Sequence, residues 1–229
     1  MSKFTCRHCS QSLDNEILDL GHQPPSNAYL NQNELFKPEI CLPLKVYICT
    51  KCWLMQIPKY ADAIELFTKD YSYTSSTSIS WVKHAKDYVD KVEKILNLNK
   101  SSLVIEIASN DGYLLDFVNK KKIPCIGIEP TELVANISIK KGINTIQKFF
   151  GEELAVNMRQ NIEICKKGAD LIIANNVLAH VPDINDFIQG IRKLLKKSGR
   201  VTIEFPHLLN LIIYNQFDTI YHELYSYLS

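Results

Sequence analysis

The chain has 229 residues, of which 46% are hydrophobic and 22% are charged. This is a globular balance with enough apolar residues for one full core or a small domain beside a larger one, and it excludes a disordered tail or a collagen-like fibre. The net charge of +1 offers no basic field for nucleic acid. No stretch approaches the roughly 20 apolar residues of a membrane helix. We therefore expect a cytoplasmic protein that binds neither nucleic acid nor a membrane.

The first 52 residues hold five of the seven cysteines, and four of these form two C-x-x-C pairs. Each pair can fold its backbone around one ion and present two thiolates, so the two pairs predict a closed, tetrahedral zinc site of the structural type. A redox or disulfide pair is the competing interpretation, but cytosolic thiols stay reduced and one pair would suffice for redox chemistry. The predicted ligands are Cys6, Cys9, Cys49 and Cys52.

Two further possible ligands lie near these pairs, Cys41 outside them and His8 inside the first. Four thiolates already complete a zinc shell, so we expect both to be packing or surface residues. The ion would replace the core that about 50 residues cannot build alone, and such a closed site should do no chemistry.

The segment over residues 61–78 connects this module to the rest of the chain. Residues 61–67 are expected to be a short helix, and residues 71–78 form a polar run with two tyrosines. A flexible linker would be rich in glycine or proline, so we expect this run to be packed or functional. Apolar residues at spacings of three and four then predict a helix over 79–96, which Ser78 or Ser80 can cap.

Strand and helix patterns alternate strictly from residue 103 onward. Short apolar runs rich in β-branched residues predict strands, and the stretches between them predict helices. Strict alternation implies right-handed crossovers and a parallel sheet covered on both faces. The predicted strands are 103–107, 125–129, 144–147, 170–174 and 200–205, and the predicted helices are 113–122, 132–141, 152–164 and 184–196.

Lysine clusters could at first sight be taken for nucleic-acid contacts. Each falls at the C-terminus of a predicted helix, where cations offset the helix dipole, and glycines follow three of them as cap or turn residues. We therefore expect a role in ending helices. The clusters are 120–122, 140–141, 166–167 and 196–197.

Polar residues follow the predicted strands at their carboxyl ends, where ligands bind in open α/β sheets. They are residues 106–112, Glu129 with Pro130, and Asn175 with Asn176. No G-x-G-x-x-G motif is present, which disfavours a dinucleotide. Glu129 is placed to accept both hydroxyls of a ribose, although it could instead cap the following helix, a role for which Glu132 competes.

These stretches resemble the class I S-adenosylmethionine-dependent methyltransferases that carry an N-terminal zinc-binding domain. The similar motifs are EIASNDGYLL (106–115), GIEP (127–130), NNVLAHVP (175–182), EFPH (204–207) and FDTIYHE (217–223). The resemblance covers essentially the whole chain, including both C-x-x-C pairs and residues 71–78. It implies an α/β fold, a Rossmann-like methyltransferase sheet preceded by a small zinc-ribbon-like domain. It also implies S-adenosylmethionine as cofactor beside a structural Zn²⁺.

The resemblance also implies where that cofactor binds. The loop over 106–112 would hold its methionine portion and Glu129 its ribose, while Phe149, Phe150 and residues 175–177 would line the adenosine pocket. The implied cofactor-binding residues are Glu106, Ala108, Asn110, Asp111, Gly112, Glu129, Pro130, Phe149, Phe150, Asn175, Asn176 and Val177.

The family includes sugar C-methyltransferases that act on nucleotide-linked 4-keto deoxysugars, and this implies a nucleotide-sugar substrate here. Carbon beside a carbonyl becomes a nucleophile only when a proton leaves, so the reaction needs a general base, an enolate stabiliser and an aligned methyl group. The catalytic residues implied by the resemblance are Tyr71 or Tyr73, His180, Tyr221, His222 and Glu223.

Two departures from the family pattern bear on activity. Relatives typically read Tyr-His-Glu-His, and the second His is the family's expected base, whereas this chain has Leu224 there. Leucine cannot take a proton. His222 could serve from the neighbouring position, or it could make only a structural contact.

The second departure is length, because relatives continue past residue 229 into two further strands and another domain. We therefore expect five of the usual seven strands, with residues 201–205 as an uncovered edge through which the chain could self-associate. The expected domains are 1–60 for zinc, 61–98 as linker and helix, and 99–229 as an incomplete methyltransferase domain. The predicted function is C-methylation of a nucleotide-linked keto-deoxysugar, and both departures argue against activity of this chain alone. The alternative is a non-catalytic zinc-containing fragment, or half of a split enzyme with a separate partner.

Overall fold

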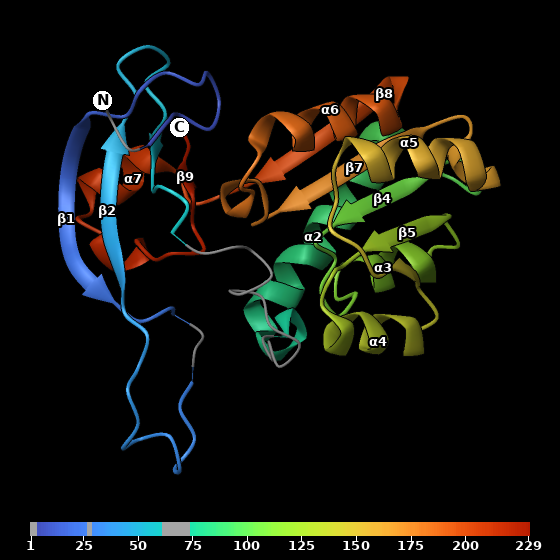
Figure 1. Ribbon diagram of the computed structural model, residues 1–229. Coiled ribbons are helices and arrows are strands. Elements are labelled where there is room, and N and C mark those ends of the chain that lie inside the picture. The colour runs from blue at the N-terminus through green and yellow to red at the C-terminus, as the bar shows by residue number, and fades with distance from the viewer. Residues whose placement is uncertain (1–3, 27–28, 61–73) are drawn as a thin grey trace. The chain divides into compact units, whose positions relative to one another are not determined.

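The computed structural model describes residues 4–26, 29–60 and 74–229 (Figure 1). The chain forms two compact units. Within the described residues, unit 1 combines residues 4–60 with 176–185 and 205–229, and unit 2 combines residues 74–175 with 186–204. The predicted domain limits 1–60, 61–98 and 99–229 follow the chain, and they stay a prediction; the compact units also group segments that lie far apart in sequence.

Unit 2 is built on a parallel sheet of five strands in the order β6-β5-β4-β7-β8. The bounds are β4 (Val104–Ile107), β5 (Cys125–Ile128), β6 (Asn144–Ile146), β7 (Ala169–Asn175) and β8 (Leu195–Glu204). All four neighbouring pairs are parallel. The α/β fold class with five strands is thus confirmed. The chain reverses its direction of winding between β4 and β7, which is where such sheets bind ligands.

Helices lie on both sides of this sheet (Figure 1). The first of them, α2, begins at the residue after Ser78, whose hydroxyl accepts a hydrogen bond from the Trp81 N–H, so the predicted cap is confirmed. Its buried residues pack with α3 and with β4 and β7 in one apolar cluster. The helices are α2 (Ile79–Leu96), α3 (Leu115–Lys120), α4 (Glu132–Lys140), α5 (Glu152–Asn161) and α6 (Ile184–Leu194).

The last strand differs from the prediction at its start. We expected a helix over 184–196, but α6 ends at Leu194 and β8 begins at the next residue, where Leu195 pairs with Ala169 of β7. The assignment of Lys196 and Lys197 to a helix C-terminus is therefore wrong. Lys196 instead places its Nζ 2.6 Å from the Asp170 carboxylate, an ion pair between neighbouring strands. β8 lies at the sheet edge among the described residues, and self-association through it stays a prediction.

Unit 1 contains a second, antiparallel sheet that the sequence did not predict, in the order β1-β2-β3-β9. Its strands are β1 (Asn15–Gln23), β2 (Leu42–Ile48), β3 (Met55–Gln56) and β9 (Ser226–Tyr227). The C-terminal residues thus complete a sheet begun by the N-terminal ones. The apolar run after β8 forms α7 (Leu208–Ile213), and Leu208 and Leu211 pack against the buried cluster of this unit.

Four short 3₁₀ turns complete the described secondary structure, over Ser75–Thr77, Glu163–Cys165, Leu178–His180 and Phe217–Thr219. The predicted helix over 61–67 lies outside the described residues, as do Tyr71 and Tyr73. Among the described helices, none has the length and apolar character to cross a membrane.

Candidate functional site

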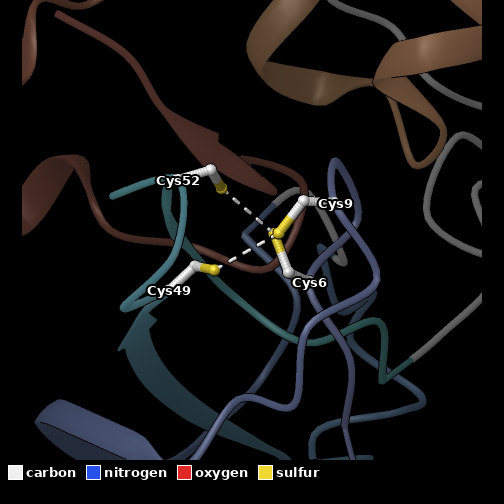
Figure 2. Close-up of side chains that lie close together, drawn as sticks. All are labelled: Cys6, Cys9, Cys49 and Cys52. Atoms are coloured by element: carbon white, nitrogen blue, oxygen red, sulfur yellow. Dashed lines mark hydrogen bonds between the residues drawn. The ribbon is translucent and has the colours of Figure 1, made fainter.

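The four cysteines of the two C-x-x-C pairs converge in unit 1, as Figure 2 shows. All four sulfur atoms lie within 4.8 Å of one another, and the Cys6–Cys52 and Cys9–Cys49 sulfurs are 3.5 Å apart. Thiolates held about 2.3 Å from a tetrahedral zinc ion would be roughly 3.8 Å apart, so this set fits the metal. The four predicted ligands thus form one cluster that can hold zinc, and the structural role of that ion stays a prediction.

The two C-x-x-C pairs have backbone turns of the same conformation, and each turn directs its two cysteines toward the cluster. We call residues 6–9 and 49–52 the first and second knuckle. In each, the residue after the second cysteine has a positive φ, 59° at Ser10 and 62° at Trp53, and donates its N–H to the carbonyl of the first cysteine at 2.9 Å. Cys41 is exposed and outside the cluster, as expected.

The Cys6 thiol is prepared for metal binding by its surroundings. Burial alone would raise its pKa, but hydrogen bonds from the backbone of Cys9 and His8 and from the Gln56 side chain lower it to about 6. Gln56 is buried in β3 and its Nε2 donates to the Cys6 sulfur at 3.2 Å. A thiol with a lowered pKa is readily available as the thiolate that zinc requires.

In unit 2, three acidic residues gather at the carboxyl ends of β4 and β5: Glu106, Asp111 and Glu129. All three are buried. Glu106 Oε2 and Asp111 Oδ1 have no hydrogen-bond partner among the described residues, whereas Asp111 Oδ2 lies 3.3 Å from the Lys141 Nζ. Burial, followed by the charges of Asp111 and Glu129, raises the pKa of Glu106 well above its usual value. Buried carboxylate oxygens without partners are open positions for a cationic ligand.

The loop after β4 has a strained backbone. Ala108 and Asn110 have φ values of 57° and 49°, and the Asn110 side chain accepts a hydrogen bond from the Ser75 N–H at 2.8 Å. Gly112 has a φ of 75°, and a Cβ there would lie 2.5 Å from Ile143 Cδ1 and 2.6 Å from Ser138 Oγ. Both the positive φ and the lack of room for a Cβ require glycine at position 112. Backbone strain of this kind is typical of ligand-binding loops.

Glu129 links this loop to the next. Its Oε2 accepts the Asn110 N–H at 3.0 Å and its Oε1 accepts the Thr131 N–H at 2.8 Å, at the start of α4. Burial raises its pKa. The alternative interpretation of Glu129, that it caps the following helix, is therefore supported by a contact. Each carboxylate oxygen has a second lone pair that could still accept a ribose hydroxyl. Binding of a ribose by Glu129 stays a prediction.

The remaining predicted cofactor residues are divided between the units. Phe149 is half-exposed, and Phe150 meets the buried Phe187 edge-on with ring centroids 5.4 Å apart. Asn175 ends β7 and hydrogen-bonds Tyr113 of unit 2. Other predicted residues lie beside these: Pro130 is half-buried next to Glu129, whereas Asn176 and Val177 belong to unit 1.

The described candidates for catalysis all belong to unit 1. The His180 Nδ1 lies 2.7 Å from the Glu223 carbonyl, so Nδ1 carries the proton and Nε2 the lone pair. Burial lowers the pKa of this imidazole. The Tyr221 ring is 6.0 Å from it, and Ser26 Oγ is 2.9 Å from both carboxylate oxygens of Glu223.

His222 and Leu224, the two residues that bear on the missing base, are buried. His222 Nε2 lies 3.2 Å from the carbonyls of Leu42 and Pro43, so it donates to the backbone at the start of β2. This is the structural contact that we considered as its alternative role. Leu224 packs in the apolar cluster of unit 1 with Val46 and Ile57 among others, where no proton acceptor is needed.

Sequence reasoning missed several residues that shape these sites, among them Arg7, Gln56, Ser26 and Tyr113. Each acts through a partner that is distant in sequence, for example Ser26 and Glu223. The only signal for Arg7 in the sequence was its place between Cys6 and Cys9. The C-x-x-C motif does not restrict which residues stand at those two positions, so it did not indicate a role for Arg7.

Two family models match the chain, and their limits follow the sequence rather than the two compact units. Residues 81–229 match a family model described as "Methyltransferase domain", and residues 6–67 match one described as "Putative zinc binding domain". The curated C-methyltransferase NovU of Streptomyces niveus is 31% identical over 228 residues, which are 98% of this chain and 52% of NovU. The chain thus spans about half the length of that relative.

Solved structures give weaker likenesses. The PH0226 protein of Pyrococcus horikoshii matches with 15% identity over 66% of each chain and a TM-score of 0.48. A SAM-dependent methyltransferase of Anabaena variabilis matches with 20% identity, 57% of this chain, 54% of that one and a TM-score of 0.46. The expected cofactors, S-adenosylmethionine and zinc, agree with the matched family models and the cysteine cluster. With nearly two thirds of its residues matched by one model, the chain belongs to the methyltransferase domain family.

Proposed function

We propose that this chain is an S-adenosylmethionine-dependent C-methyltransferase for a nucleotide-linked keto-deoxysugar. Its similarity to the C-methyltransferase NovU over almost its whole length supports the reaction type. The sugar substrate rests on the resemblance of the chain's five motifs to a family that includes the nucleotide-sugar C-methyltransferases.

One observation carries the cofactor part of the proposal. Glu106, at the winding reversal of the sheet, is buried with Oε2 unpartnered among the described residues, and Asp111 has an unpartnered Oδ1 nearby in the chain. S-adenosylmethionine carries an ammonium and a sulfonium, and cations of this kind would return a buried carboxyl with a raised pKa to its charged form. These two residues would hold the methionine portion, and Glu129 the ribose.

The methyl group is what the cofactor supplies when bound. This chain's residues must hold the sugar, take a proton from the carbon beside the keto group and stabilise the enolate that remains. The proton would pass to a base as the new C–C bond replaces the S–C bond. We assign the base to His180 through Nε2, and enolate stabilisation to Tyr221 with Tyr71 or Tyr73. Glu223 would orient the substrate.

The cofactor assignment can be tested by titrating the zinc-loaded chain with S-adenosylmethionine and S-adenosylhomocysteine in a calorimeter. We expect saturable binding, weakened about tenfold in Glu106→Gln, which corresponds to roughly 1.4 kcal/mol of lost charge interaction. Glu163→Gln is the matched control, because that carboxylate is exposed and bonded only to Lys166 in the described structure. Absence of heat at millimolar cofactor would refute the proposal.

A second candidate is a cofactor-binding chain that does not transfer methyl groups. It is favoured by Leu224, which is buried among apolar side chains where the family carries its expected base. Transfer of a labelled methyl group to a keto-deoxysugar nucleotide separates the two. A normal enzyme rate that is lost in His180→Gln supports the first candidate, whereas binding without turnover supports the second.

A further inference from the structure

Of the chain segments that the structure describes, two carry candidate catalytic residues, and the first zinc knuckle contacts both through side chains between its cysteines. Arg7 and His8 occupy the two positions between Cys6 and Cys9. All the contacts described below lie within unit 1.

Arg7 is the centre of these contacts. Its Nη1 donates to the Pro182 carbonyl at 2.8 Å, its Nη2 donates to the Ile57 carbonyl, and its guanidinium lies 4.9 Å above the Tyr225 ring. Burial lowers the pKa of Arg7 to about 10, which still leaves it charged at neutral pH. A charged fork with two backbone acceptors and an aromatic face is a geometry that lysine cannot reproduce.

His8 adds a second contact to the same segment. Its Nδ1 lies 2.9 Å from the Asn185 Oδ1, and the Asn185 Nδ2 donates to the His8 carbonyl at 2.8 Å. Residues 176–185 are therefore held near their end at two points, Pro182 and Asn185. His180 lies two residues before the first of them.

The C-terminal segment is held by the same elements. Tyr225 lies under the Arg7 guanidinium, and its carbonyl accepts the Ile57 N–H at 3.0 Å. Two residues earlier, the Glu223 carbonyl lies 2.7 Å from the His180 Nδ1. Arg7 thus joins, on one side chain, the segment that carries His180 and the segment that carries Glu223.

The backbone of Arg7 is itself fixed to the cluster. Its N–H donates to the Gln56 Oε1 at 3.0 Å, and the Nε2 of the same buried amide donates to the Cys6 sulfur. A shift of the knuckle would therefore move the guanidinium with it, and the carbonyls of Ile57 and Pro182 would lose their donor. Leaving a buried acceptor without a donor is unfavourable, and Ile57 is fully buried.

We propose that Arg7 is a positioning residue through which the zinc knuckle holds residues 176–185 against residues 221–225. The structural metal site thereby fixes His180 and Glu223 relative to each other. The positional claim stands on the contacts alone, and its consequence for catalysis rests on the proposed function. The competing explanation is that Arg7 only adds stability to unit 1 as a whole.

Hydrogen–deuterium exchange of the whole chain distinguishes these explanations. We compare wild type with Arg7→Lys, which keeps the charge but loses the fork, and with Asn185→Ala, which removes a contact without altering the knuckle. Arg200→Lys is the matched control, because that guanidinium donates to carbonyls of its own neighbours, Ser198 and Gly199. Zinc content, and the charge-transfer absorption of the cobalt-substituted chain, report whether the cluster is intact.

With the metal retained, we expect at least tenfold faster exchange over 177–183 and 221–225 in Arg7→Lys. The same should hold over 177–183 in Asn185→Ala. The β1–β2 pair should keep its protection, and Arg200→Lys should match wild type. Unchanged exchange in these segments would overturn the proposal, and so would an equal increase over all of unit 1.

Kinetics then test the consequence separately. If the chain transfers methyl groups, Arg7→Lys should lower kcat with little change in the affinity for S-adenosylhomocysteine. If wild type binds no cofactor, the proposed function fails, and the exchange result still decides the position of the two segments. A kcat in Arg7→Lys equal to that of the control would overturn the catalytic consequence.

Discussion

Units 1 and 2 are built by different means. Unit 2 is a parallel sheet whose strands and helices follow one another along the chain, and its apolar cluster comes mainly from α2, α3, β4 and β7. Unit 1 assembles three separate chain segments around an antiparallel sheet and four cysteines. Hydrophobic periodicity therefore specifies a unit of the first kind, whereas a unit of the second kind depends on contacts across long sequence distances and on a metal.

Loss of the metal should have the largest effect and should be confined to unit 1. In Cys49→Ser we expect no bound zinc and loss of protection in β1 and β2, because structural zinc contributes about 10–16 kcal/mol to the folding of small metal modules. The sheet of unit 2 should keep its protection. Zinc analysis and amide exchange resolved by peptide measure both.

Cys41→Ser is the matched control, since that thiol is exposed and outside the cluster. It should bind zinc as wild type does. A metal-free Cys49→Ser chain with β1 and β2 still protected would show that unit 1 has a sufficient core of its own.

A substitution that leaves a cavity in the core of unit 2 should do the reverse: it should destabilise unit 2 and leave unit 1 folded. Ile105 is fully buried in β4, and Ile105→Ala should lower the free energy of unfolding of unit 2 by about 2–5 kcal/mol, from lost burial and the cavity left behind. Unit 1 should keep its zinc. Ile95→Ala, at a position 63% exposed on α2, should change stability by less than about 0.5 kcal/mol. Urea unfolding followed together with zinc release measures the two units separately, and simultaneous loss would contradict the comparison.

The contrast between the two units also explains which parts of the fold could be predicted from the sequence. The five strands of unit 2 were located to within a few residues, because apolar runs such as 103–107 are bounded by polar turns. The exception was the start of β8, where Leu195 joins the strand through its pairing with Ala169. Local periodicity cannot indicate a partner 26 residues away.

Unit 1 was only partly predictable. The cysteine spacing indicated the metal site, but β9 is two residues long and pairs with β3 across most of the chain, so no local pattern marks it. For the candidate site, Glu106 and Glu129 could be placed from their positions at strand ends. The contacts of Arg7 could not be predicted, because its guanidinium donates to carbonyls that come close to it only in the folded chain.

The loop after β4 allows a smaller and sharper comparison between two glycines. Gly112 and Gly21 have similar φ values, 75° and 76°, but a Cβ would collide with Ile143 and Ser138 at the first and meet nothing within 4 Å at the second. Gly112→Ala should therefore destabilise unit 2 by about 1–3 kcal/mol and weaken binding of S-adenosylhomocysteine.

In Gly21→Ala the only cost is the left-handed backbone conformation, which should lower the free energy of unfolding of unit 1 by roughly 1 kcal/mol. Cofactor affinity should be unchanged. Thermal unfolding and calorimetry of the two variants measure both effects. Equal effects of the two substitutions on cofactor affinity would argue against a role of this loop in binding.

The pH dependence of unit 2 should give the smallest effect, and its direction follows from burial. Because the pKa of Glu106 is raised in the folded chain, the folded state holds this proton longer than the unfolded state does. The free energy of unfolding should therefore fall as the pH rises above the ordinary carboxyl value of about 4.3, until the folded pKa is passed. Glu106→Gln has no proton to lose, so it should flatten this slope and leave the ligand-free chain more stable at neutral pH.

Glu129→Gln is the informative contrast, because burial raises the pKa of Glu129 as well. Both its oxygens accept backbone N–H groups, from Asn110 and Thr131, and an amide nitrogen cannot replace one of them as an acceptor. This variant should therefore lose stability at every pH while Glu106→Gln gains it at neutral pH. Urea unfolding between pH 5 and 8 separates the two carboxylates: one is kept open for a cation at a cost in stability, and the other is used to hold the loop. A gain in both variants would mean that Glu129 also has no structural task, and that both carboxylates are available to a ligand.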